Sequence, residues 1–186
     1  AGVRVSTLSA SGSVLYKSHT FFLAEPRAEL SWRLDHNSRL SVSFNQASQN
    51  LHMLSNSSVG LPSDMWLPVN SILKPITMRQ FSGGYERDLW NKRCTFSVEG
   101  YYRKSDGIID YKDNADLFLN NRIEEQVLTG ESNGYGVECS LAKNSGSITG
   151  RISYTYSRSY NRIAGIEEGK QYPSILDRPH NLKLFL

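Results

Sequence analysis

The sequence contains no long apolar run, only two cysteines and no block of like charges. No stretch approaches the roughly 18 consecutive apolar residues of a membrane-spanning helix, which excludes a helical membrane protein. Cys94 and Cys139 lack the spacing of a zinc site, and we interpret them as small apolar residues. A disulfide between them stays open if their strands are neighbours in an oxidising compartment. The net charge of +3 is spread along the chain, so we expect no nucleic-acid partner.

Signatures of catalysis and cofactor binding are also missing. There is no Gly-rich phosphate loop and no Ser-His-Asp pattern. Asp110, Asp113 and Asp116 lack the spacing and the glycine of a calcium loop, and His180 is a lone histidine. The sequence therefore predicts a protein that is not an enzyme, with no cofactor and no metal site.

Residues 22–54 alternate between apolar and polar side chains with a period of two. The first half carries apolar residues at its even positions: Phe22, Ala24, Pro26, Ala28, Leu30, Trp32 and Leu34. A tight polar turn at 35–38 follows, and Leu40, Val42 and Phe44 then repeat the pattern. Such alternation places apolar groups on one face of a strand and polar groups on the other. The segment predicts a two-faced β-hairpin.

The same alternation along the chain predicts about eight strands. They cover residues 1–8, 20–34, 39–54, 79–89, 94–111, 132–142, 147–161 and a last strand from about 180. Several reach about 15 residues, against roughly five to six in a typical globular domain. Turns of about four residues alternate with long connections at 55–78, 112–131 and 162–179. We therefore predict an all-β, antiparallel, up-and-down meander.

Two architectures use such a sheet. In a soluble sandwich the apolar face points into a core, whereas in a transmembrane barrel it meets lipid and the polar face lines a wet lumen. Short turns at one end and long loops at the other favour the barrel, as do Trp32 and Trp90 near the short-turn end. The predicted fold class is a partial transmembrane β-barrel.

Several short segments resemble, in their order and spacing, the barrel of TonB-dependent receptors, the gated importers of the bacterial outer membrane. They are EPR at 25–27, LHMLS at 51–55, LPSDMW at 61–66, KP at 74–75, QFSGGY at 80–85, IDYKD at 109–113, GYGVE at 134–138, ISYTYS at 152–157 and DRPH at 177–180. The resemblance implies a barrel of about 22 strands with a plugged lumen. Residues 1–186 are then a fragment of its later part, without the plug domain.

The resemblance also implies a function and partners. The parent protein would be an energy-coupled receptor in the bacterial cell outer membrane. It would bind a scarce nutrient (metal chelate, vitamin, glycan or peptide) at extracellular loops and import it. The implied partners are outer-membrane lipid, the plug domain of the same parent chain, a TonB-type energy-coupling protein and the small nutrient ligand.

Two groups of residues are candidates for this function. Asp64, Met65 and Trp66, in a proline-stiffened outer loop, are predicted ligand contacts, although they would equally pin the loop to its neighbours. The polar face supplies the predicted lumen-facing residues Glu25, Arg27, Glu29, Arg33, Glu99, Glu138 and Arg151. In a soluble sheet, these charges would form the solvated face instead.

Three rival functions stay open. A soluble surface β-sandwich that binds glycan or protein predicts strands of roughly five to eight residues and two sheets packed on each other. A passive porin-like channel would need no plug. An enzyme would use Glu99 and Glu138 as an acid/base pair, which nothing else in the sequence supports.

Overall fold

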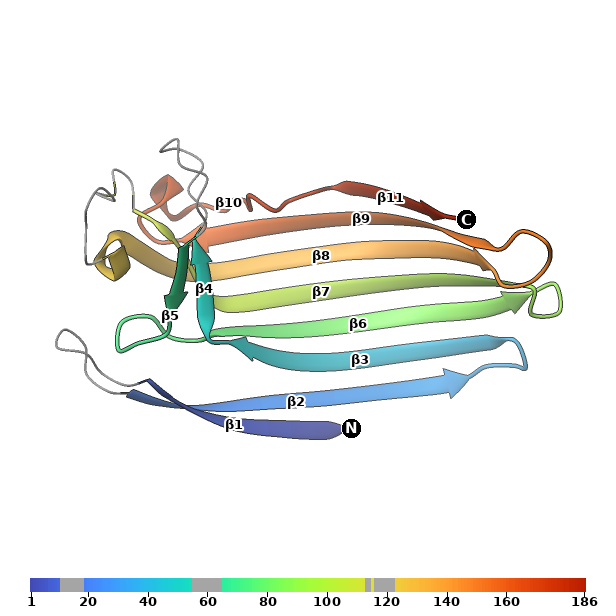
Figure 1. The fold of residues 1–186 in the computed structure, drawn as a ribbon, viewed down its shortest axis with the longest axis horizontal. Coiled ribbons are helices and arrows are strands. Elements are labelled where there is room, and N and C mark those ends of the chain that lie inside the picture. The colour runs from blue at the N-terminus through green and yellow to red at the C-terminus, as the bar shows by residue number, and fades with distance from the viewer. Residues whose placement is uncertain (11–18, 55–64, 113–114, 116–122) are drawn as a thin grey trace.

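The computed structural model describes residues 1–10, 19–54, 65–112, 115 and 123–186, and its main element is one nine-stranded sheet (Figure 1). In spatial order its strands are β1 (Gly2–Ala10), β2 (His19–Arg33), β3 (Ser38–Gln49), β6 (Ile76–Leu89), β7 (Cys94–Tyr111), β8 (Val127–Lys143), β9 (Gly150–Ile163) and, both against β9, β10 (Tyr172–Pro173) and β11 (His180–Phe185). All neighbours are antiparallel. The predicted all-β meander is confirmed.

Two short 3₁₀ turns, η1 (Ile123–Gln126) and η2 (Glu167–Gly169), are the helical elements within the described ranges. None of the helices in these ranges has the length and apolar character needed to cross a membrane.

A second, two-stranded sheet corrects part of the prediction. The strand expected over 39–54 breaks at Asn50, and β4 (Leu51–Leu54) pairs with β5 (Met65–Pro68) instead of continuing along β6 (Figure 1). The break allows Leu54 and Leu67 to pack with Leu73 and Val127 in a buried cluster. Burial of these side chains favours the break at Asn50 over a strand that continues to Leu54 along β6.

The strand boundaries at the long connections also differ from the prediction. The structure places β5 and the start of β6 within 55–78, which was expected to be a connection. It likewise begins β8 at Val127 rather than near 132. β6 and β8 are therefore longer than the alternation alone indicated, whereas β7 covers the predicted residues 94–111.

The register gives the main sheet an apolar face and a polar face. Directly paired residues point to the same side, as Leu30, Val42 and Gly83 do across β2, β3 and β6. Leu30 is 60% exposed and Phe81 is 57% exposed, because no second layer covers the apolar face within the described residues. This excludes the packed two-sheet sandwich, which would bury these side chains.

The apolar face ends in an aromatic row toward the long-loop end. Phe44, Phe81, Tyr102 and Tyr135 lie in register across four strands, and the rings of Phe44 and Phe81 are 4.7 Å apart. Beyond this row come charged side chains, with Lys104 Nζ 2.6 Å from Glu131 Oε2. The opposite end carries Trp32 and Trp90, 48% and 69% exposed. An apolar band between two aromatic borders is typical of a membrane barrel.

The short turns are bonded to one another at that opposite end. The amide of Asp88 donates to the carbonyl of Asn37 at 2.7 Å, and the amide of Asn144 donates to the carbonyl of Arg93 at 2.8 Å. Within the first turn, the amide of Asn37 donates to Asp35 Oδ1 at 2.7 Å, and this bond holds the pKa of Asp35 below its usual value. The turns thus form a continuous rim.

Backbone pairing between β2 and β3 stops halfway along the strands. The ladder runs only from Arg27 to Arg33 of β2, next to Pro26, which has no amide hydrogen to donate. Toward the N-terminal end of β2, beyond this ladder, two side chains bridge the strands. Gln46 Nε2 donates to the carbonyl of Ala24 at 2.8 Å, and the amide of Ser48 donates to Glu25 Oε1 at 2.8 Å.

Cys94 and Cys139 are both free. Their strands are neighbours, but Cys94 pairs with Lys143 and Cys139 pairs with Val98. This offset along the strands corresponds to about 13 Å, well beyond the roughly 7 Å limit between the Cα atoms of a disulfide. The register therefore excludes a disulfide between them.

Candidate ligand-binding cavity on the polar face

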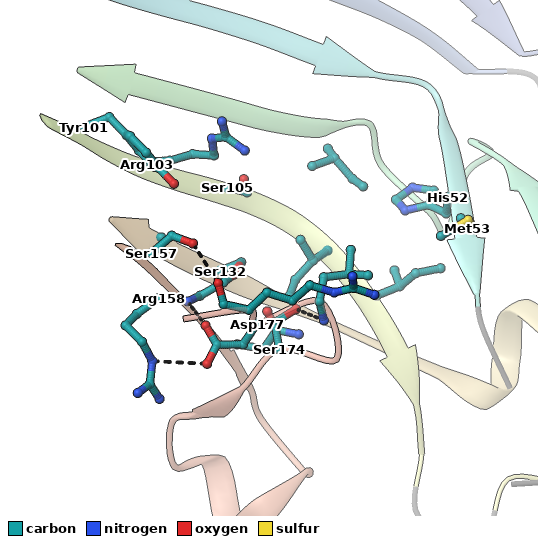
Figure 2. A pocket seen from close by; sticks show the side chains of 18 residues that line it. His52, Met53, Tyr101, Arg103, Ser105, Ser132, Ser157, Arg158, Ser174 and Asp177 are labelled. Carbon is teal, nitrogen blue, oxygen red and sulfur yellow. Dashed lines mark hydrogen bonds and ion pairs between the residues drawn. The ribbon is translucent and has the colours of Figure 1, made fainter. Parts of the chain in front are cut away.

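A cavity of about 420 Å³ lies on the polar face at the long-loop end of the sheet (Figure 2). Its floor comes from neighbouring strands β7, β8 and β9, and its sides come from β4 and the segment 174–178. The volume falls within the range of roughly 300–1,000 Å³ that small-molecule sites occupy.

The floor is built from small residues and one large ring. Tyr101 pairs with Gly136, and Arg103 pairs with Gly134. Because Gly136 has no side chain, the Tyr101 ring lies across it; a Cβ there would stand 2.8 Å from the phenol oxygen. Gly136 therefore makes room for the Tyr101 ring, while Gly134 lines the cavity itself.

Arg103 brings a positive charge to the floor. Its Nε and Nη2 atoms donate to Gln80 Oε1 at 3.0 and 2.8 Å, and its Cζ lies 5.8 Å from the centre of the Tyr101 ring. Gln80 is neutral, and no carboxylate in the described ranges forms an ion pair with Arg103. The Arg103 guanidinium is thus held in a fixed orientation, but no carboxylate in the described ranges neutralises its charge.

The segment 174–178 is fastened to the edge of β9 between β10 and β11. Asp177 Oδ1 accepts the amide of Ser159 at 2.7 Å, and its Oδ2 lies 3.1 Å from Arg158 Nε. The hydroxyl of Ser157 donates to the carbonyl of Arg178 at 3.2 Å. Asp177 substitutes for a strand partner here, so the segment can bulge over the polar face without leaving β9 unpaired.

His52 lies at another side of the cavity and is fully buried. Its Nε2 is 2.9 Å from the carbonyl of Lys74, a geometry that assigns the proton to Nε2. Nδ1 is then an acceptor, and it is buried without a hydrogen-bond partner. Burial lowers the pKa of His52 and outweighs the opposite effect of the Lys74 carbonyl, so the imidazole is neutral at pH 7.

The predicted polar residues share one face but lie outside this cavity. The register places Glu25, Arg27, Glu29, Arg33, Glu99, Glu138 and Arg151 on the polar face. Glu25 is buried, with Arg4 Nε 3.8 Å from its Oε2. Glu99 pairs directly with Glu138. None of them lines the cavity.

Of the predicted loop contacts, Met65 and Trp66 do not line the cavity. Asp64 falls outside the described residues. Met65 packs against the buried cluster around Leu54, which is the structural role that the sequence left open. Trp66 is 56% exposed on β5 and does not line the cavity.

The sequence analysis missed the charged and titratable residues that do line the cavity: His52, Arg103, Arg158, Asp177 and Arg178. One signal was available, because Tyr101, Arg103 and Ser105 follow one another on the polar face toward a long connection. The contributions of β4 and of the segment 174–178 depend on tertiary pairing, which no local pattern reveals.

Within the described ranges, no three or more His, Cys, Asp or Glu side chains gather as they would around a metal ion.

The long strands, the two-faced wall and the polar cavity together define a partial transmembrane β-barrel. A family model described as TonB dependent receptor-like, beta-barrel matches residues 1–186, so the chain belongs to this family of receptors and transporters. No curated protein and no solved structure matches the chain.

Proposed function

We propose that this chain is part of the barrel wall of an outer-membrane receptor that binds a scarce nutrient and imports it with energy supplied through a TonB-type protein. The observation that carries the proposal is the single sheet of long strands whose apolar face stays uncovered. An apolar face that extends over a whole sheet is normally covered by a binding partner or by lipid. Lipid hydrocarbon fits this face, because aromatic side chains border its apolar band at both ends.

We place the nutrient site in the cavity on the polar face. It lies at the long-loop end of the sheet, where binding residues commonly occur, and its largely polar lining also includes apolar side chains such as Ile108 and Ile109. Asp64, Met65 and Trp66 are proposed as further ligand contacts. Lipid, the nutrient, the energy-coupling protein and a plug domain of the same parent chain are the proposed partners, and the bacterial outer membrane is the proposed location.

The polar face would then line the lumen and contact the plug. Its rows of serine and glycine are small, as a closely packed neighbour requires, and hydroxyls bond across strands, with Ser43 and Ser97 each 2.8 Å from their partners Ser82 and Ser140. Glu99, Glu138 and Arg151 offer charges to that neighbour. A plug distinguishes this receptor from a passive porin-like channel.

Cysteine labelling in cells that produce the receptor without its plug tests the arrangement. Cys94 and Cys139 are first replaced by alanine, and Val42→Cys or Ser43→Cys is then introduced on opposite faces of β3. We expect a lipid-soluble maleimide to label position 42 and a water-soluble maleimide to label position 43 in plugless receptor. Equal labelling of both positions by the water-soluble reagent would refute membrane insertion.

Transport has a separate test. We expect uptake of the nutrient by cells to stop when the proton gradient is dissipated, while binding at the cell surface continues. Uptake that persists without the gradient would support the porin-like channel instead.

A further inference from the structure

We propose that the cavity binds an acidic sugar, with its carboxylate on Arg103 and Arg178 and its hydroxyl groups on the serines and on His52. This inference rests on the proposed function, because it names the ligand class of the same receptor site.

The charge of the lining favours an anion. Asp177 is the one carboxylate among the described lining residues, and it is already engaged by Arg158 and by the amide of Ser159. Arg178 is exposed and has no ion-pair partner in the described ranges, and Arg103 bonds only the neutral Gln80. Two arginines that line the cavity therefore carry charges that no described carboxylate balances, and guanidinium matches a carboxylate in geometry.

The remaining polar lining favours hydroxyl groups on the ligand. The lining includes five serines and one asparagine: Ser105, Ser132, Ser157, Ser159, Ser174 and Asn161. The hydroxyls of Ser132 and Ser157 donate to the carbonyls of Tyr160 and Arg178, which leaves their oxygens as acceptors. A sugar hydroxyl both donates and accepts, so it suits a wall that offers both kinds of group.

His52 separates a sugar acid from a simple inorganic anion. Its unpartnered Nδ1 accepts hydrogen bonds, so it needs a donor and would repel a sulfate or carboxylate oxygen. Figure 2 shows His52 and Arg103 at separate sides of the cavity. A ligand with an anionic group at one position and hydroxyl donors at another satisfies both sides at once.

The shape of the floor agrees with a sugar ring. Tyr101 offers its ring beside Arg103, while Ile108 and Ile109 add apolar surface to the same cavity. Sugars present C–H faces as well as hydroxyl edges, so a mixed wall of this kind contacts both.

Calorimetry on the intact receptor in detergent tests the inference with two matched probes. They are the α-1,4-linked disaccharide of galacturonic acid and the neutral α-1,4-linked disaccharide of galactose. We expect the acidic probe to bind at least tenfold more tightly, with a preference that shrinks as salt screens the charges.

Variants then assign the charge. We expect Arg103→Gln and Arg178→Gln each to weaken binding of the acidic probe about tenfold and to leave the neutral probe little changed. Arg87→Gln, on the apolar face near the short turns, removes the same charge away from the cavity and should change neither. Arg178 lies on an exposed segment, so its variant tests the site even if Arg103→Gln disturbs β7.

Equal binding of the two probes, an unchanged preference in both variants, or binding of neither probe would overturn the acidic-sugar inference. Failure of the proposed function would show separately, because the maleimide labelling of positions 42 and 43 tests membrane insertion without any ligand.

Discussion

Glu99 on β7 pairs directly with Glu138 on β8, so two carboxylates lie side by side on the polar face. Both are exposed, and neither forms an ion pair within the described residues. Like charges directly opposite each other in a sheet are destabilising, by roughly 0.2–1 kcal/mol. A plug domain that places a cation between them would reverse this effect.

Glu138→Gln should therefore have opposite effects with and without the plug. In a plugless receptor, we expect it to stabilise the barrel by about 0.5 kcal/mol, because the repulsion with Glu99 is removed. In the intact receptor, we expect it to weaken plug retention, because a plug cation loses a partner. Urea unfolding of both forms measures the difference, and a stabilisation of equal size in both would rule out a cationic partner.

Leu30→Arg should prevent stable insertion of the barrel, because it places a charge in the apolar band. We expect a loss of about 2 kcal/mol or more, against little change for Ser31→Arg on the polar face of the same strand. Reversible folding into lipid vesicles, followed by the gel shift of the folded form, measures both variants. Equal losses would contradict the assignment of the two faces.

Gly136→Ala should destabilise the floor of the cavity. The new Cβ would lie 2.8 Å from the phenol oxygen of Tyr101 and 2.8 Å from the carbonyl of Tyr156, and the latter is backbone. We expect a loss of about 1–3 kcal/mol from overpacking and weaker binding at the cavity. Gly134→Ala is the control for stability alone, because its closest contact is an ordinary 3.6 Å although it also lines the cavity; calorimetric unfolding compares the two.

Acid should loosen the small sheet of β4 and β5 through His52. The pKa of His52 in the folded chain is below its ordinary value of 6.5, so the unfolded segment binds a proton more readily. The stabilisation is complete above pH 6.5 and is lost as the pH falls toward the lowered pKa. Hydrogen exchange of residues 51–54, corrected for intrinsic rates, should rise faster in the native chain than in His52→Gln as the medium is acidified.

The sequence predicted the two faces of the main sheet well, because the alternation around Leu30 and Phe44 is a local consequence of strand geometry. It failed at Asn50, where pairing with β5 and burial of Leu54 outweigh the local pattern. The same limit applies to the cavity. Arg103 is visible as a polar-face residue, but its proximity to His52 and Arg178 follows from pairings between distant segments.

The stretch where side chains rather than a backbone ladder join β2 and β3 has a consequence for how the sequence of this wall can evolve. A backbone ladder is nearly indifferent to residue identity, since only proline removes one of its donors. Beyond the ladder the two strands are bridged by the side chains of Glu25 and Gln46, so one codon change there can separate the upper parts of β2 and β3 while the ladder from Arg27 to Arg33 holds the rest together. Selection can thus adjust the mouth of the wall at this place without rebuilding any strand.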